Sequence, residues 1–230
     1  LFACVAPHAL GVSAAAAFLG ALASALLVFF VSAYAGASRL TIVLAGMALT
    51  AIFTAGMNTV LIFNPDAYVN SSGFLVGSLS GVMVSELAIP GIMICAGLIL
   101  AMGQGTRLNI LSLGDEGAHA LGLNVNCTRL ALLSLAALLA GAAVCFSGLI
   151  GFVGLIVPHV VRYVAGHDNR RVLVLSPIVG AILVCACDTI ARTLFAPFEI
   201  PVGICMALVG GPFFIYLILR SRKGEVDGRA

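Results

Sequence analysis

Two pairs of charged or titratable residues in this 230-residue sequence could support chemistry. Asp188 and Arg192 are four positions apart, which on one helix brings a carboxylate and a guanidinium together as a local ion pair. His159 and Arg162 follow Pro158 in a strongly apolar run, where such groups could form a proton relay or bind a metal. We favour a structural interpretation, because Arg162 can extend its charge to a membrane surface and the imidazole can bond carbonyls freed at a proline turn.

The cysteines and the missing motifs exclude several kinds of enzyme. The cysteines lie almost entirely inside apolar runs, without the paired spacing of a disulfide framework or a zinc site. They are Cys4, Cys95, Cys127, Cys145, Cys185, Cys187 and Cys205. We interpret them as small core residues and predict neither a metal site nor a cofactor. The sequence has no Gly-x-x-x-x-Gly-Lys-Ser/Thr phosphate loop and no nucleophile-base pair, so we predict no catalytic residue and no ATP hydrolysis by this chain.

Composition predicts that lipid is the solvent of this chain. Hydrophobic residues make up 62% of it and charged residues only 9%, whereas a soluble domain has roughly 25% charged residues. Apolar stretches of about 20 residues recur, and a helix of that length crosses the hydrocarbon layer with its backbone groups hydrogen-bonded. The 26 glycines suit close helix packing in lipid. A net charge of +2 without a basic stripe does not indicate nucleic acid binding.

The apolar runs predict an all-α integral membrane bundle of about seven transmembrane helices. Runs without charge occur at about 9–33, 40–63, 87–103, 130–157, 172–187 and 200–219. The fourth is too long for one span and contains Gly148, Gly151 and Gly154 shortly before Pro158. We therefore divide it into helices at about 127–147 and 154–165, joined by a glycine-rich turn. Residues 73–81 are predicted to be an irregular or re-entrant piece.

Charge placement predicts the orientation, because Lys and Arg accumulate in cytoplasmic loops. One side of the bundle receives Arg39, Arg107, Arg129, Arg170, Arg171, Arg220, Arg222, Lys223 and Arg229. The other side receives Asp66, Glu86 and Glu199, with Arg192 the only basic residue near it. We therefore predict a cytoplasmic C-terminus and an external segment Leu1 to His8. The chain opens without an initiator methionine or a basic region, which argues against an ordinary signal peptide.

A predicted cytoplasmic connection, residues 104–126, looks like two short helices hinged at Gly114. Asp115 and Glu116 then fall in the first turn of the second helix, where carboxylates complement the helix dipole, and Gly122 suits its C-terminal end. Its small apolar face would consist of Ala118, Leu121 and Leu123. Such a pair could transmit movement of a soluble partner, although an ordinary interfacial loop lying on lipid would show the same pattern.

Several motifs resemble one family of membrane proteins. The run Leu111-Ser-Leu-Gly-Asp-Glu-Gly-Ala-His-Ala-Leu-Gly-Leu123 resembles the coupling segment of the iron-siderophore, haem and vitamin B12 family of ABC importer permeases, which are FecCD/BtuC-like. Gly148-Leu-Ile-Gly-Phe-Val-Gly-Leu-Ile-Val-Pro-His-Val-Val-Arg162 resembles the family's most characteristic run. Further matches are Asp188-Thr-Ile-Ala-Arg192, Glu199-Ile-Pro-Val-Gly203 and Gly210-Gly-Pro-Phe-Phe214. Residues 39–103 match more loosely, through helix spacing and Gly77-Ser-Leu-Ser-Gly81.

The resemblance implies a fold and a motor partner. The family's subunit has the ten-helix type II ABC importer permease fold, and this chain would begin just before the fourth helix. Residues 1–230 would then be a single permease transmembrane domain, incomplete at its N-terminus, with residues 104–126 as its coupling helices. In the family these helices sit in a groove of a separate ATP-binding subunit. The residues that would couple to that subunit are Leu111, Gly114, Asp115, Glu116, Ala118, Leu121 and Gly122.

The resemblance also implies a docking residue and a solute pathway. Arg192 matches an arginine that contacts a glutamate of the extracytoplasmic solute-binding protein, although a local pair with Asp188 is the simpler alternative. The pathway would follow the interface with a second permease copy, identical or homologous, and would be lined by about 40–62 and 202–219. The candidate pathway residues are Thr50, Thr54, Met57, Asn58, Met206 and Gly210.

Together these features predict a permease subunit that imports an iron-siderophore or a related chelate, haem or cobalamin, across a bacterial cytoplasmic membrane. Its partners would be a pair of ATP-binding subunits, a solute-binding protein, a second permease copy and membrane lipid. The competing class is an ion-coupled secondary transporter, which requires intramembrane carboxylates and repeated, interrupted helices. Asp188 is the single candidate carboxylate, and Arg192 would neutralise it.

Overall fold

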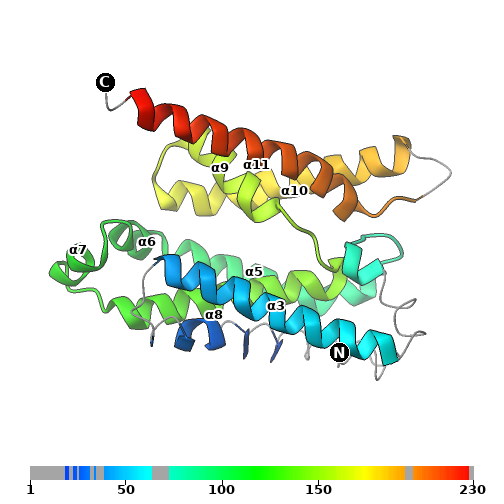
Figure 1. The fold of residues 1–230 in the computed structure, drawn as a ribbon, viewed down its shortest axis with the longest axis horizontal. Helices are drawn as coiled ribbons and strands as arrows, with labels where there is room; N and C mark the ends of the chain where they lie inside the picture. The colour runs from blue at the N-terminus through cyan, green and yellow to red at the C-terminus, as the bar shows by residue number, and fades with distance from the viewer. Residues whose placement is uncertain are drawn as a thin grey trace. The chain divides into compact units, whose positions relative to one another are not determined.

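Helices are the only regular elements in the part of the chain that the computed structural model describes (Figure 1). The described residues are 19–20, 23–24, 26–31, 34, 39–63, 73–194 and 199–227. The all-α membrane fold predicted from composition is confirmed. The predicted external segment Leu1 to His8, and most of the predicted first span at about 9–33, lie outside the described residues.

The apolar runs become helices because a helix satisfies its backbone groups internally. From residue 39 onward the elements are α3 (Arg39–Phe63), η1 (Val84–Leu87), α5 (Ala88–Met102), α6 (Gly105–Leu111), α7 (Asp115–Ala120), α8 (Val125–Ser147), α9 (Val153–Ala165), α10 (Asn169–Leu194) and α11 (Val202–Asp227). Each run predicted after residue 39 coincides with one of them. α10 and α11 extend beyond the predicted ends, because arginine and lysine favour helix and do not end one where the apolar run stops.

The described helices differ in length. Val43–Phe63 of α3, all of α8 and all of α10 are each long and apolar enough to cross a membrane. α5 and α6 meet the same criterion only together, with a bend of 55° at the break between them. α9 and Val202–Leu217 of α11 are shorter apolar helices. The short helix predicted after the glycine-rich turn is therefore α9.

The break between α8 and α9 confirms the predicted division of the long apolar run. α8 ends at Ser147 and α9 begins at Val153. Between them Gly148 has φ of 66° and Phe152 has φ of 65°, so both adopt the left-handed conformation. That conformation is uncommon for a residue with a side chain, and here it separates two apolar helices without a polar linker.

The chain divides into two compact units. One unit contains Leu1–Leu75 and Gly81–Phe146, and among the described elements it holds α3, η1 and α5 to α8. The other unit contains Val76–Ser80 and Ser147–Ala230, and it holds α9 to α11. A short piece of the first half of the sequence therefore folds with the C-terminal helices.

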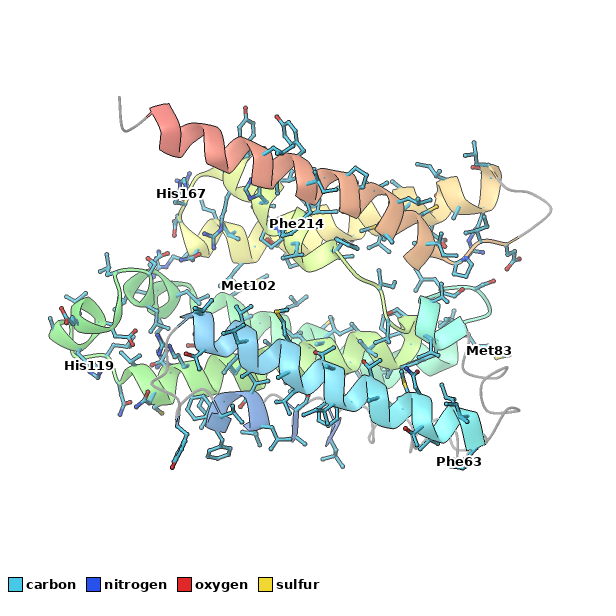
Figure 2. The ribbon with its side chains drawn as sticks, viewed as in Figure 1. Phe63, Met83, Met102, His119, His167 and Phe214 are labelled. Carbon is cyan, nitrogen blue, oxygen red and sulfur yellow. The ribbon has the colours of Figure 1, made fainter. Side chains whose placement is uncertain are left out.

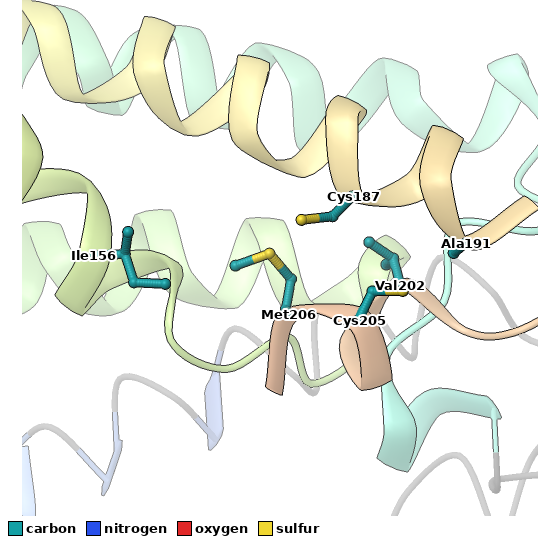
Figure 3. Packing of buried hydrophobic residues seen from close by; sticks show 6 residues of the cluster. All are labelled: Ile156, Cys187, Ala191, Val202, Cys205 and Met206. Atoms are coloured by element: carbon teal, nitrogen blue, oxygen red, sulfur yellow. The ribbon is translucent and has the colours of Figure 1, made fainter. Parts of the chain in front are cut away.

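Each unit has its own close contacts. In the first unit α5 approaches α8 at Gly97, where a Cβ atom would lie 2.6 Å from Cδ2 of Leu139. Small residues allow such approaches between apolar helices. In the second unit α9, α10 and α11 pack against one another around a buried core (Figure 3). That core consists of Ile156, Cys187, Ala191, Val202, Cys205 and Met206.

Candidate functional site

The connector, which we define as residues 104–126, has the predicted pair of short helices. α6 ends at Leu111 and α7 begins at Asp115. Between them Gly114 has φ of 93° and ψ of 170°, a conformation that is essentially restricted to glycine. The Gly114 N–H donates to the carbonyl of Leu111 at 3.3 Å, and the Gly114 carbonyl accepts the N–H of Ala118 at 3.0 Å. The predicted hinge is therefore a defined, hydrogen-bonded turn.

The end of α7 is fixed by a Schellman motif. Gly122 has φ of 77°, and its N–H donates to the carbonyl of His119 at 2.9 Å. The N–H of Leu123 donates to the carbonyl of Ala118 at 3.0 Å. These two bonds satisfy carbonyls that the helix end would otherwise leave without partners. The predicted stop at Gly122 is confirmed.

One side-chain contact joins α7 to α8, and another caps the start of α8. Nη2 of Arg129 donates to Oδ1 of Asp115 at 2.7 Å, with the two side chains 19% and 51% exposed. Oδ1 of Asn124 accepts the N–H of Cys127 at 3.1 Å and so caps α8. The sequence assigned Asp115 to the surface that couples to the ATP-binding subunit. The structure also gives it a partner within the chain, so Asp115 helps to hold α7 in place.

The exposed residues of the connector are mostly polar, and two large apolar side chains lie among them. Leu113 and Leu121 are 65% and 61% exposed, whereas Ala118 is fully buried, so the apolar face predicted for α7 is divided. The predicted coupling residues comprise exposed Asp115, Glu116, Leu121 and Gly122, partly buried Leu111 and Gly114, and buried Ala118. Leu113, which the prediction did not include, is also exposed. Its position directly before the hinge glycine was the available signal.

A second site lies in the C-terminal unit, where Val76–Ser80 is held by main-chain hydrogen bonds. We call these residues the anchored segment. The N–H of Ser78 donates to the carbonyl of Ser147 at 3.0 Å, and the N–H of Gly203 donates to the carbonyl of Gly77 at 3.1 Å. The anchored segment therefore links the residue that ends α8 to the first turn of α11. Residues 77–81 have an irregular backbone, as the sequence predicted, whereas residues 73–76 of the same predicted piece are helical.

Two glycines permit this close packing. A Cβ atom on Gly203 would lie well under 3.0 Å from the carbonyl oxygen of Val76, a separation that real Cβ atoms essentially never show. A Cβ atom on Gly77, which has φ of 80°, would lie 2.6 Å from the carbonyl oxygen of Leu149. In both cases the obstacle is main chain, which cannot move aside as a flexible side chain can.

Arg192, the predicted docking residue, belongs to the same unit. Its Nε donates to Oδ2 of Asp188 at 2.8 Å, and the side chains are 45% and 23% exposed. The predicted local pair is therefore present, but it uses Nε and leaves nearly half of the arginine side chain exposed. The hydroxyl of Ser80 donates to Oε2 of Glu199, a contact that the sequence did not indicate.

The predicted pathway residues fall into two groups. On α3, Thr50, Thr54 and Asn58 are exposed and follow each other at intervals of four, while Met57 is partly buried. The Thr50 hydroxyl donates to the carbonyl of Gly46 at 2.8 Å within the helix. On α11 the two members are inside the unit's own packing. Met206 is fully buried, and a Cβ on Gly210 would collide with the ring of Phe152.

His159 has a packing contact. Pro158 and His159 lie inside α9 rather than at a turn, because the turn that redirects the chain comes earlier, at Phe152. The imidazole meets the ring of Phe213 edge to face, with the centroids 6.4 Å apart. This contact supports the structural interpretation of His159.

The cysteines only partly match the core interpretation. Cys187 and Cys205 are buried and Cys145 is partly buried, whereas Cys95, Cys127 and Cys185 are exposed. A small apolar side chain is tolerated on a face that meets lipid, so an apolar run alone did not separate core from lipid-facing positions. In the described part of the chain, no three or more His, Cys, Asp or Glu side chains are grouped so that they could hold a metal ion.

An all-helical fold with several apolar spans and an exposed helical connector defines this chain as a multi-span membrane protein. Comparison with known proteins then gives the family. Residues 2–220 match the FecCD transport family, so the chain belongs to that family of transport permeases. The resemblance drawn from the sequence motifs is confirmed.

The relatives are permease proteins of transport and import systems. The chain is 42% identical over 208 residues to the hemin transport system permease protein HmuU of Yersinia pestis, covering 90% of the chain and 62% of that protein. It is 39% identical over 212 residues to the cobalamin import system permease protein BtuC of Halobacterium salinarum, covering 90% and 56%. Thus the chain spans about three fifths of the length of these relatives.

A solved structure has the same fold. It is assigned to the metal-chelate type of ABC transporter and is in an inward-facing conformation. The similarity covers 93% of this chain and 75% of that one, with a TM-score of 0.76 and 28% sequence identity.

Proposed function

We propose that this chain is the permease subunit of an ABC importer that moves an iron-siderophore or a related chelate, such as haem or cobalamin, into the cytoplasm. A separate pair of subunits would hydrolyse ATP. The proposal rests on one observation above all: a FecCD-family chain folds residues 104–126 as an exposed helix pair held by its own caps and ion pair. The chain would lie in a bacterial cytoplasmic membrane, and the placement of its basic residues favours an orientation with this connector and the C-terminus inside.

The connector would bind the ATP-binding subunit through its exposed leucines. Leu113 and Leu121 offer apolar area on either side of α7, and burying a leucine contributes about 1.5–3 kcal/mol. Ala118 packs inward, and Asp115 is bonded to Arg129 of α8. A push on the leucines would therefore be transmitted to α8, which is long enough to span the membrane.

A binding experiment tests this contact. The tagged chain is expressed with the ATP-binding subunit of its own transport system, and the amount that co-purifies is measured. We expect Leu121→Asp to reduce recovery by about tenfold or more, since it removes apolar area and adds a charge. Asn126→Asp adds the same charge nearby without removing a leucine, and it should retain the partner. Equal loss in both variants, or no recovery with the unchanged chain, would refute the proposed coupling role.

Arg192 would dock an acidic residue of a solute-binding protein. The bond from its Nε to Asp188 orients the guanidinium and leaves the two Nη groups outside that bond, where they could form a bidentate contact with a carboxylate. We expect Arg192→Gln to weaken binding of the solute-binding protein by about tenfold at low salt and less at high salt. Arg107→Gln, which removes a charge from α6, is the matched control and should have no effect.

The exposed α3 face would line the solute pathway at the interface with a second permease copy. Thr50, Thr54 and Asn58 give it a sparsely polar surface, which suits passage of a bulky chelate already selected by the binding protein. Met206 and Gly210 would shape α11 from inside the unit. An ion-coupled transporter is less well supported, because Asp188 is bonded to Arg192.

A further inference from the structure

The turn between α9 and α10 concentrates positive charge that neither the connector nor Arg192 explains. Residues 162–171 contain three arginines and one carboxylate, which gives a formal charge of +2 with histidine neutral. The complete chain also has a formal net charge of +2. The side chains of Arg162, Arg170 and Arg171 are all exposed. This turn is therefore a basic patch, separate in the sequence from the basic run Arg220 to Lys223 near the C-terminus.

Local bonds give the turn a defined structure. Nη2 of Arg162 donates to Oδ1 of Asn169 at 3.1 Å, and this neutral amide positions the guanidinium without cancelling its charge. Oδ1 of Asp168 accepts the N–H of Arg170 at 3.0 Å and so caps α10. Gly166, with φ of 83°, ends α9, and its N–H donates to the carbonyl of Arg162 at 3.0 Å. The single carboxylate is thus engaged as a helix cap.

Apolar side chains lie directly beside this charge. Tyr163 and Val164, in the last turn of α9, are 78% and 80% exposed. The turn joins an apolar helix to a helix long enough to span, which places it at a membrane surface; Figure 2 shows His167 at this turn. At such a surface an aromatic ring can enter the headgroup region while arginine binds phosphate.

We propose that this turn binds the phosphate headgroup of an anionic phospholipid, with Arg162 and Arg171 as the main cations and Tyr163 as the interfacial anchor. A guanidinium can bond two phosphate oxygens at once. A zwitterionic lipid carries the same phosphate together with an ammonium group, which the arginines repel. The site should therefore prefer lipids with net negative charge, whatever solute the protein transports.

Native mass spectrometry of the full chain tests this preference. The probes are phosphatidylglycerol and phosphatidylcholine with identical acyl chains, and the measurement is the fraction of protein that retains each lipid. We expect the unchanged chain to retain the anionic lipid at least about fivefold more, because each arginine near an anionic surface contributes roughly that factor. Arg162→Gln/Arg171→Gln should abolish the preference, whereas Arg107→Gln/Arg220→Gln removes equal charge elsewhere and should keep it. Equal retention of the two lipids, or an unchanged preference in the first variant, would overturn the proposal.

A fluorescence measurement locates the lipid, because the sequence contains no tryptophan. Tyr163→Trp introduces a single reporter at the turn, and Tyr216→Trp introduces a control on α11. Dibrominated phosphatidylglycerol should quench the reporter at 163 more than dibrominated phosphatidylcholine does, and the two should quench the control equally. If inorganic phosphate removes the difference, the site binds soluble anions and the lipid proposal is wrong. The lipid proposal is also wrong if adding the ATP-binding subunit prevents both lipids from quenching the tryptophan at position 163, because the turn would then be covered by that subunit.

Discussion

Gly203 and Gly114 show that the anchored segment and the connector need glycine for different reasons. A Cβ on Gly203 would collide with the carbonyl of Val76, so a side chain is excluded by neighbouring main chain. No atom lies within 4 Å of the same position on Gly114, where the requirement comes from φ of 93° alone. The anchored segment is thus built by close packing, and the connector by local conformation on an exposed surface. Substitutions in the first should lower stability, and substitutions in the second should mainly alter its shape and contacts.

The largest expected effect is that of Gly203→Ala. The new methyl group has no space beside the Val76 carbonyl, so the main-chain hydrogen bond from Gly203 to Gly77 should be lost and the unit should rearrange. We expect the free energy of unfolding in detergent to fall by about 3 kcal/mol or more. Gly211→Ala on the same helix meets no atom within 4 Å and should be neutral or slightly stabilising. Equal stability of the two variants would show that the close approach at Gly203 is wrong.

Gly114→Ala should have a smaller and more local effect. Alanine would be strained at this φ and ψ by about 1–3 kcal/mol, so the connector should open while the membrane helices keep their stability. Hydrogen exchange should accelerate over residues 105–120, with little change in the unfolding midpoint. Gly103→Ala, at a right-handed helical position with φ of −67°, should leave exchange unchanged. Acceleration in both variants would contradict the special role of Gly114.

Asn124→Ala removes the side chain that caps α8. We expect the free energy of unfolding to fall by about 1 kcal/mol, because the N–H of Cys127 loses its acceptor. Amide exchange at the start of α8 reports this change directly. Asn126→Ala, one residue into α8, is the control. Similar destabilisation by both changes would mean that the cap contributes nothing particular.

The smallest expected effect is that of Asp115→Asn. The ion pair of Asp115 with Arg129 is partly exposed, so breaking it should lower the free energy of unfolding by about 0.2–1 kcal/mol. Denaturation in detergent measures this change, and the difference between the variant and the unchanged chain should be smaller at high salt. Glu116→Gln changes the neighbouring carboxylate, for which no ion pair is found among the described residues, and should cost less. A larger fall in stability for Glu116→Gln than for Asp115→Asn would mean that Glu116, and not Asp115, forms the ion pair with Arg129.

The sequence could predict those parts of the fold that depend on local conformation. The division of the long apolar run follows from its glycines, and the structure has left-handed residues at Gly148 and Phe152. The end of α7 follows from Gly122, whose Schellman bonds involve only the residues beside it. The family could also be predicted, because its motifs are contiguous runs.

The sequence could not predict which faces of the helices are buried. In lipid both the core and the outer face of a helix are apolar, so the sequence did not show that Met206, a pathway candidate from the family resemblance, is fully buried within its unit. The contact of Ser80 with Glu199 joins residues 119 positions apart, and no periodic pattern marks it. Similarly, the bond from Asp115 to Arg129 depends on how α7 folds back, which the spacing of the two residues does not reveal.

Photo-crosslinking at Leu121 tests the central claim that the connector binds the ATP-binding subunit. A benzophenone amino acid replaces Leu121 in one sample and Leu208, an exposed leucine of α11, in the other. The chain is expressed in its native membranes, and the adducts are identified by mass spectrometry. We predict that position 121 crosslinks to a protein with a Gly-x-x-x-x-Gly-Lys-Ser/Thr phosphate loop and that position 208 does not. Adducts of lipid alone at position 121, or the same protein captured at both positions, would contradict the account.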